Sequence, residues 1–274
     1  MADAKTKLEP NADLSFRDLT QLSLNKANLS GARLSAVDLD GVQMKHCRLG
    51  KAILDGARLE KADLSGATLT QASLRSTVFV RAILNGTDLT EANLMLADFS
   101  YTDQHDTVYD YADLRASNFA RSKLINTSLC GCLLNCADFS YGTWNNVDCS
   151  GAELVNASLV KVVLALVTMR DCRLDFADLT GAGAVGVNLE GASLIRTVLA
   201  GVDLSQANLL NTRLVEADLT GANLKKAYLK GAHLEGAILD KANLTGAQLT
   251  FEQISAAKSM TEAIMPDGSV YHAK

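Results

Sequence analysis

Apolar residues recur along this chain with a period of five. From Leu14 to Leu249 every fifth position is a slot, and of these slots 37 hold Leu, four Phe and two Met. The residue two places before a slot is usually small, and the residue between them is often Asp or Asn. This period matches neither a helix nor a single alternating strand. It predicts a short extended segment followed by a corner, with the small residue and the slot residue both facing inward.

The glycines and prolines agree with repeated corners. Of the 19 Gly, 15 lie two places after a slot, where a tight corner needs the positive φ that Gly adopts easily. Pro10 and Pro266 both lie outside the repeats. This is expected where each strand N–H is needed as a donor.

A second period of 20 residues sets the number of segments in a coil. Phe79, Phe99, Phe119 and Phe139 all occupy slots and are 20 residues apart. Four segments per coil would stack these rings in one column, about 4.8 Å apart. The slots from Leu14 to Leu249 then fill about 12 coils. The slots that hold neither Leu, Phe nor Met are Gln104, Tyr109, Trp144, Cys149 and Ala184.

The repeat resembles the pentapeptide-repeat family, whose motif is small–Asp/Asn–Leu–Ser/Thr/Arg–Gly. The segments 62–66 (Ala-Asp-Leu-Ser-Gly) and 217–221 (Ala-Asp-Leu-Thr-Gly) match the motif at every position. The resemblance implies an all-β fold, a right-handed quadrilateral parallel β-helix of about 12 four-sided coils. This solenoid is expected over residues 12–250.

The two ends depart from the repeat. Residues 1–11 form a polar segment, which we expect either to add a strand over the first coil or to leave it open to a head-to-head dimer. Residues 251–274 predict a short capping α-helix and a tail that resemble the end of cyanobacterial family members. Thr250 is the expected N-cap, with Gln253 completing a capping box. Residues 265–268 (Met-Pro-Asp-Gly) predict a turn.

Composition and charge narrow the classes of function. The net charge is −5 with both signs mixed, so direct binding of nucleic acid is not expected. No apolar run reaches the roughly 18 residues of a membrane span. The start of the sequence has no apolar secretion signal, so we expect a cytoplasmic protein. Its oligomeric state is expected to be a monomer or an end-to-end homodimer.

Three motifs suggest chemistry, and each has a structural interpretation. The segment 181–186 matches G-x-G-x-x-G, but the five-residue register runs through it, so we expect no cofactor. Four of the six cysteines fall in inward positions, which predicts structural thiols and no metal site. Asp103, His105, Asp106 and Asp110 form a polar cluster around Gln104. It is either a divalent-ion site or a solvated corner.

One group of outward residues is unexpectedly apolar: Ile125, Val163, Ala165, Leu166 and Val185. Such a strip is a candidate contact surface for another protein, although outward Val and Ile also simply favour strands. No catalytic residues are predicted, because a coil filled by Leu and Ala leaves no substrate cavity. We therefore expect a non-catalytic scaffold for protein–protein interaction. The alternative, implied by the family, is a DNA mimic that binds DNA gyrase, but the outward charges sum to only −1, −3, +1 and −2 on the four sides.

Overall fold

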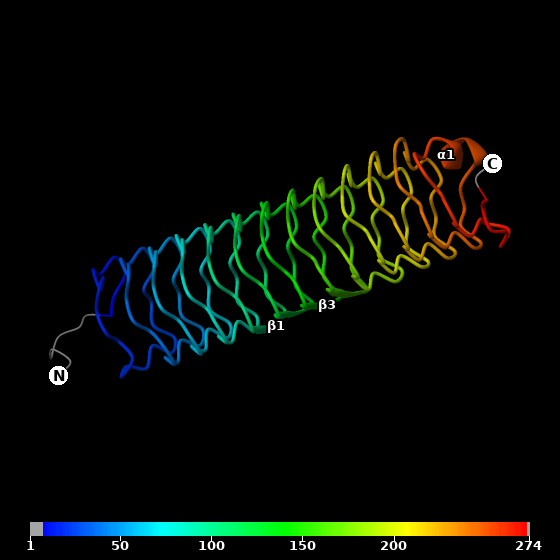
Figure 1. The fold of residues 1–274 in the computed structure, drawn as a ribbon. Coiled ribbons are helices and arrows are strands. Elements are labelled where there is room, and N and C mark those ends of the chain that lie inside the picture. Colours follow the sequence, from blue (N-terminus) through cyan, green and yellow to red (C-terminus); the bar gives the residue numbers. More distant parts are fainter. Residues whose placement is uncertain (1–7, 273–274) are drawn as a thin grey trace. The chain divides into compact units, whose positions relative to one another are not determined.

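A computed structural model describes residues 8–272, and the chain divides into two compact units. Unit 1 is Met1–Leu134 and unit 2 is Asn135–Lys274. Within each unit the chain winds as a right-handed quadrilateral β-helix whose coils stack one on the next (Figure 1). The expectations for the N-terminal segment fall largely on residues 1–7, which lie outside the described residues.

Backbone hydrogen bonds show why four segments make one coil. Arg33 pairs in parallel with Asp13 on the preceding coil and with Ile53 on the following coil. Its N–H donates to the carbonyl of Ala12 at 2.9 Å. The same step relates the pairs along each unit, so every fourth slot lies on the same face. We number the faces in chain order, with Leu14 on face 1, Leu19 on face 2, Leu24 on face 3 and Leu29 on face 4.

The corners need a left-handed backbone whichever residue occupies them. Gly66 has a φ of +67°, and the ring of His46 lies over it. A Cβ added to Gly66 would come within 2.4 Å of His46 Nδ1. Lys61 occupies the equivalent corner with a φ of 57°. An L-residue in this conformation costs roughly 1–2 kcal/mol. The N–H of Lys61 offsets part of this cost by donating to the carbonyl of Val80 at 3.0 Å.

Four face-3 segments are regular three-residue strands. Unit 1 contains β1 (Asp103–His105) and β2 (Lys123–Ile125), which pair in parallel with Gln104 opposite Leu124. Unit 2 contains β3 (Thr143–Asn145) and β4 (Val163–Ala165), with Trp144 opposite Leu164. In each strand the middle side chain is buried and the two flanking side chains point outward.

Large aromatic rings stack inside unit 1, as the repeat of the coil predicts. The ring centroids of Phe79 and Phe99 are 4.7 Å apart, and those of Phe99 and Phe119 are 4.6 Å apart. All three side chains are buried. Phe139 belongs to unit 2, where it is buried and meets the edge of Trp144 at a centroid distance of 4.9 Å.

Two of the slots that lack Leu form a buried polar network. The Tyr109 hydroxyl donates to Gln104 Oε1 at 2.7 Å, and Gln104 Nε2 donates to Thr102 Oγ1 at 2.8 Å. Thr102 in turn donates to the carbonyl of Phe99 at 2.7 Å. Because Gln104 and Tyr109 are fully buried, these bonds replace the water that each polar group loses on folding.

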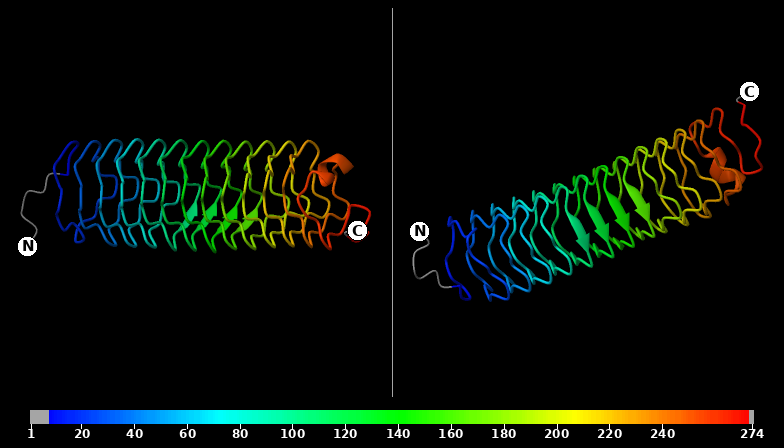
Figure 2. Two further views of the ribbon diagram at one scale, coloured as in Figure 1. Left: turned by 45° about the horizontal axis from the view of Figure 1, so that its top comes forward. Right: turned by 90° about the horizontal axis from the view of Figure 1, so that it is seen from below.

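The C-terminal end of unit 2 carries the predicted helix, α1 (Phe251–Ser255). Figure 2 shows α1 in orange at this end. Thr250 and Gln253 form the expected capping box. Gln253 Nε2 also donates to the carbonyls of Leu229 and Ala232, at 2.8 and 2.7 Å, which anchors the helix to the preceding coil. Within residues 8–272 no helix has the length and apolar character needed to cross a membrane.

After α1 the chain rejoins the ladder, which the repeat pattern did not predict. Ser259 pairs with Ile238 and Ile264 pairs with Asn243, both in parallel. The two residues of each pair are separated by one more position in the sequence than the paired residues of the preceding coils. The extra residue is taken up around α1, and the five-residue register is lost there. The predicted turn is present at residues 265–268, where the N–H of Gly268 donates to the carbonyl of Met265 at 2.9 Å.

Candidate functional site

The apolar outward residues of unit 2 gather on face 3. Val163 and Ala165 are the outward residues of β4, on either side of the buried Leu164. Val163 pairs with Gly183, which places Val185 on the next coil of the same face. The exposed fractions are 77% for Leu166, 51% for Val163 and 49% for Val185.

Alternation along the strand explains why these side chains point outward. Leu164 takes the inward slot, so its neighbours must face solvent whatever their polarity. Leu166 occupies a corner with a φ of 55°. Four exposed apolar side chains therefore share one side of unit 2. Ile125 is the last residue of β2 in unit 1, where its side chain is half-buried.

The polar cluster around Gln104 separates into an inward and an outward part. Gln104 itself is buried in the network described above, while Asp103 and His105 flank it on the outside of β1. Asp103 Oδ2 lies 3.1 Å from Lys123 Nζ, and Asp103 Oδ1 lies 3.3 Å from His105 Nε2. Asp106 Oδ1 accepts a hydrogen bond from Asn126 Nδ2 at 3.0 Å.

Asp110 lies on face 4, away from the face that carries Asp103. Its Oδ1 accepts hydrogen bonds from Ser128 Oγ and from the N–H of Cys130 on the next coil. Among the residues that the structure describes, no three His, Cys, Asp or Glu side chains meet in a way that could hold a metal ion. The arrangement favours the solvated-corner interpretation, in which each carboxylate bonds to a neighbouring coil.

The glycine-rich segment and the cysteines have structural positions. Ala184 occupies a buried slot, and Gly183 pairs with both Val163 and Asp203, so the motif is part of the ladder. All six cysteines are thiols, and four of them are buried. Burial raises the pKa of the Cys47 thiol to about 11. Such a thiol stays protonated and unreactive near neutral pH.

Exposed aromatic and cationic side chains alternate at the corners of face 2. In unit 1 the guanidinium carbons of Arg81 and Arg121 lie 5.8 and 6.0 Å from the ring centroid of Tyr101. In unit 2 Lys161 Nζ lies 5.7 Å from the ring centroid of Tyr141. These contacts were not predicted, although the recurrence of rings and cations at equivalent corners of successive coils was a visible signal in the sequence.

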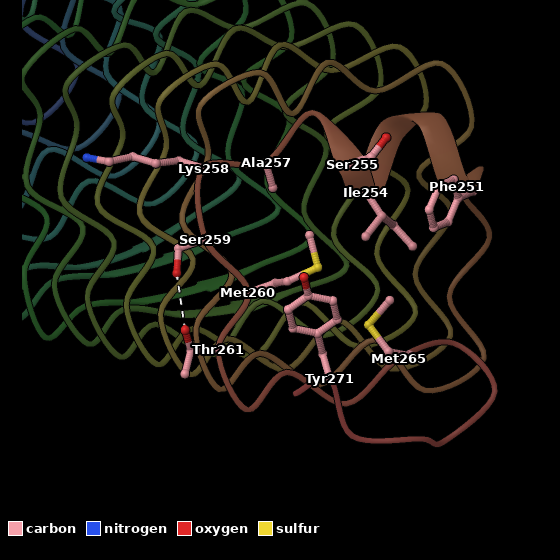
Figure 3. Close-up of a pocket in the computed structure, with 10 residues that line it drawn as sticks. All are labelled: Phe251, Ile254, Ser255, Ala257, Lys258, Ser259, Met260, Thr261, Met265 and Tyr271. Carbon is pink, nitrogen blue, oxygen red and sulfur yellow. Dashed lines mark hydrogen bonds between the residues drawn. The ribbon is translucent and has the colours of Figure 1, made fainter. Parts of the chain in front are cut away.

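A hollow of about 400 Å³ lies at the C-terminal end of unit 2. Figure 3 shows the side chains of Phe251, Ile254, Met260, Met265 and Tyr271 converging on it from α1 and from the chain that follows. Ile254 is buried, but Phe251 is 78% exposed. The predicted capping helix therefore closes the end only in part.

Comparison with known proteins shows what the chain is similar to. The family model for pentapeptide repeats matches residues 11–45, 43–79, 72–103, 112–143, 145–182, 185–221 and 217–250. HetL, a pentapeptide repeat protein involved in heterocyst differentiation regulation in the cyanobacterium Nostoc sp. strain PCC 7120, is 30% identical. The match covers 98% of this chain and 94% of HetL, with a TM-score of 0.40. Among curated proteins none matches the chain.

Two further solved structures are similar over shorter or more divergent alignments. A pentapeptide repeat protein from the Arabidopsis thaliana thylakoid lumen is 25% identical, covering 44% of this chain and 81% of its own, with a TM-score of 0.34. Full-length QnrB1, a plasmid-mediated fluoroquinolone resistance protein, is 16% identical. That match covers 76% of this chain and 91% of QnrB1, with a TM-score of 0.26.

Proposed function

The chain belongs to the pentapeptide repeat family, and from that premise we propose that it is a non-catalytic scaffold that binds another protein. The contact surface we propose is the apolar part of face 3 in unit 2, formed by Val163, Ala165, Leu166 and Val185. Ile125 on face 3 of unit 1 is a further candidate contact.

The observation that supports this proposal is the exposure of large apolar side chains where the repeat normally places polar ones. Leu166 is 77% exposed, so most of its surface lies in water. Burying it against a partner would contribute about 1.5–3 kcal/mol. The rigid, repeated backbone beneath it keeps the surface in one shape, which lowers the entropy cost of association.

Affinity capture from the native cell tests the proposal, with the full chain as bait and mass spectrometry as the readout. Leu166→Asp should lose at least nine-tenths of a protein that the unaltered chain captures, because it places a carboxylate in an apolar contact. Leu96→Asp is the matched control, since Leu96 is also an exposed corner residue, at 55%, and lies in unit 1. Asp tolerates the left-handed conformation of both corners. Equal capture by both variants would contradict the assignment of the surface.

Other interpretations are supported less well. Binding to DNA gyrase by imitation of DNA requires a continuous acidic face, and face 3 of unit 2 carries Lys225 and Lys226. An enzyme would need converging catalytic groups. Half of the residues that line the end hollow are Phe, Ile, Met or Tyr, and the hydroxyl of Ser259 in its wall already donates to Asp240. We propose a cytoplasmic location because the six thiols suit a reducing compartment.

A further inference from the structure

Face 3 of unit 2 changes character along its length. Nine consecutive outward positions carry no charge: Thr143, Asn145, Asn146, Val163, Ala165, Leu166, Gly183, Val185 and Gly186. The following coil presents Asp203, Ser205 and Gln206, and the coil after it presents Asn223, Lys225 and Lys226. The apolar contact surface is thus followed along the same face by a pair of cations.

The backbone places these cations in line with the apolar residues. The N–H of Gly186 donates to the carbonyl of Ser205, and the N–H of Gln206 donates to the carbonyl of Lys225, both at 2.9 Å. Both lysines are exposed. The stem of Lys226 lies over Gly246, where an added Cβ would be 3.5 Å from its Cγ. The start of the Lys226 side chain therefore lies beside the next corner, and the side chain as a whole is exposed.

A third lysine continues the cationic region onto face 4. Lys230 and Tyr228 are both exposed on the same coil as Lys226. Tyr228 pairs with Asn208 on one side and with Gln248 on the other, so uncharged amides flank it. Lys230 and Gln248 also line a hollow of about 320 Å³.

The three lysines are available to bind an acidic ligand. Among the described residues, none of Lys225, Lys226 and Lys230 takes part in an ion pair. Asp203 is the acid on the adjoining coil of face 3, and its Oδ1 already accepts hydrogen bonds from the N–H of Ser205 and from Asn223 Nδ2, both at 3.0 Å. Three cations are therefore concentrated on adjoining faces 3 and 4 of one coil, in a chain whose net charge is −5.

We propose that this part of faces 3 and 4 binds an extended segment of a partner protein in which a run of apolar residues adjoins a cluster of Asp or Glu. The inference rests on the proposed function and adds the chemistry of the partner and the spatial order of its apolar and acidic parts along the face. Leu166 and Lys226 are three coils apart, about 14 Å at the spacing of neighbouring strands. About four residues of extended chain span that distance. A nucleic acid is disfavoured because its phosphates would find no donor on the apolar part.

Fluorescence anisotropy with labelled peptides tests the proposal on the full chain. The probe is Val-Ile-Val-Ser-Thr-Ser-Glu-Asp-Glu, and its controls are the same peptide with the acids replaced by Gln and a single-stranded oligonucleotide of equal length. The triple variant K225Q/K226Q/K230Q should bind the acidic probe about tenfold more weakly, because it loses three exposed ion pairs with the acids of the probe. K45Q/K51Q/K61Q in unit 1 makes the same change in net charge and should bind like the unaltered chain.

Salt and the competing ligands complete the test. Raising the salt concentration should weaken binding of the acidic probe to the unaltered chain but not to the K225Q/K226Q/K230Q variant. No binding of the probe by the unaltered chain, or equal binding by both triple variants, would overturn the proposal. So would tighter binding of the oligonucleotide that depends on these lysines. If Leu166→Asp loses a captured partner but K225Q/K226Q/K230Q keeps it, the scaffold function stands and this inference fails.

Discussion

Replacing Phe99 with Ala should open a cavity in the middle of the aromatic column of unit 1. The ring lies between Phe79 and Phe119, at 4.7 and 4.6 Å, and Tyr109 meets it edge-on at 5.8 Å. Its side chain is fully buried, so no solvent can fill the space left behind. The rings above and below are held by their own coils and can relax only in part.

The expected destabilisation is large. Truncating a buried Phe to Ala costs about 3–5 kcal/mol. Phe99→Leu should cost less, about 1 kcal/mol, because Leu fills most slots of the same β-helix and keeps much of the volume. Phe16→Ala is the control for loss of an aromatic side chain, since Phe16 is 81% exposed. It should change stability by less than about 0.5 kcal/mol.

Urea unfolding followed by circular dichroism measures these differences. The urea midpoint should be highest for Phe16→Ala, lower for Phe99→Leu and much lower for Phe99→Ala. A repeat protein can unfold in stages, so the comparison uses the transition assigned to unit 1. If Phe99→Ala and Phe16→Ala unfold at the same urea concentration, the stacked rings do not stabilise the coil as we infer.

Three other results are expected. Burial raises the pKa of Tyr109 well above its ordinary value, although the hydrogen bond to Gln104 lowers it. Stability should therefore fall as the pH rises above about 10, where only the unfolded chain ionises. The urea midpoint of Tyr109→Phe should depend less on pH in this range than that of the unaltered chain. An equal dependence in the two proteins would contradict the prediction. Gln253→Ala should speed hydrogen exchange in α1 relative to the unaltered chain, because it removes the capping box and both anchoring bonds. In the native protein a thiol reagent should label the exposed Cys136 rapidly and Cys47 only after unfolding. Rapid labelling of both would show that the coil interior is open.

The sequence predicted the coil because the feature that builds it is periodic. Inward Leu at every fifth position and the regular spacing of Phe79, Phe99 and Phe119 follow directly from the stacking of equal coils. The corners were predicted from their glycines alone. Lys61 shows that the backbone bonds of the ladder impose the same left-handed conformation on other residues.

The sequence could not predict features that depend on a single departure from the repeat. Gln104 and Tyr109 occupy neighbouring slots, and only their inward stacking makes one the partner of the other. The extra residue around α1 hides the return of Ser259 and Ile264 to the ladder. The candidate surface was visible as apolar residues in outward positions, but the exposure of Leu166 depends on the corner geometry that follows β4.

Photo-crosslinking in the native cell tests the central claim, that face 3 of unit 2 contacts a partner protein. A photoreactive amino acid in place of Leu166 should give one discrete crosslinked product of higher mass on illumination. The same amino acid in place of Leu96, which is also an exposed corner residue, should not give that product. A crosslink of equal yield from both positions, or from neither, would contradict the account.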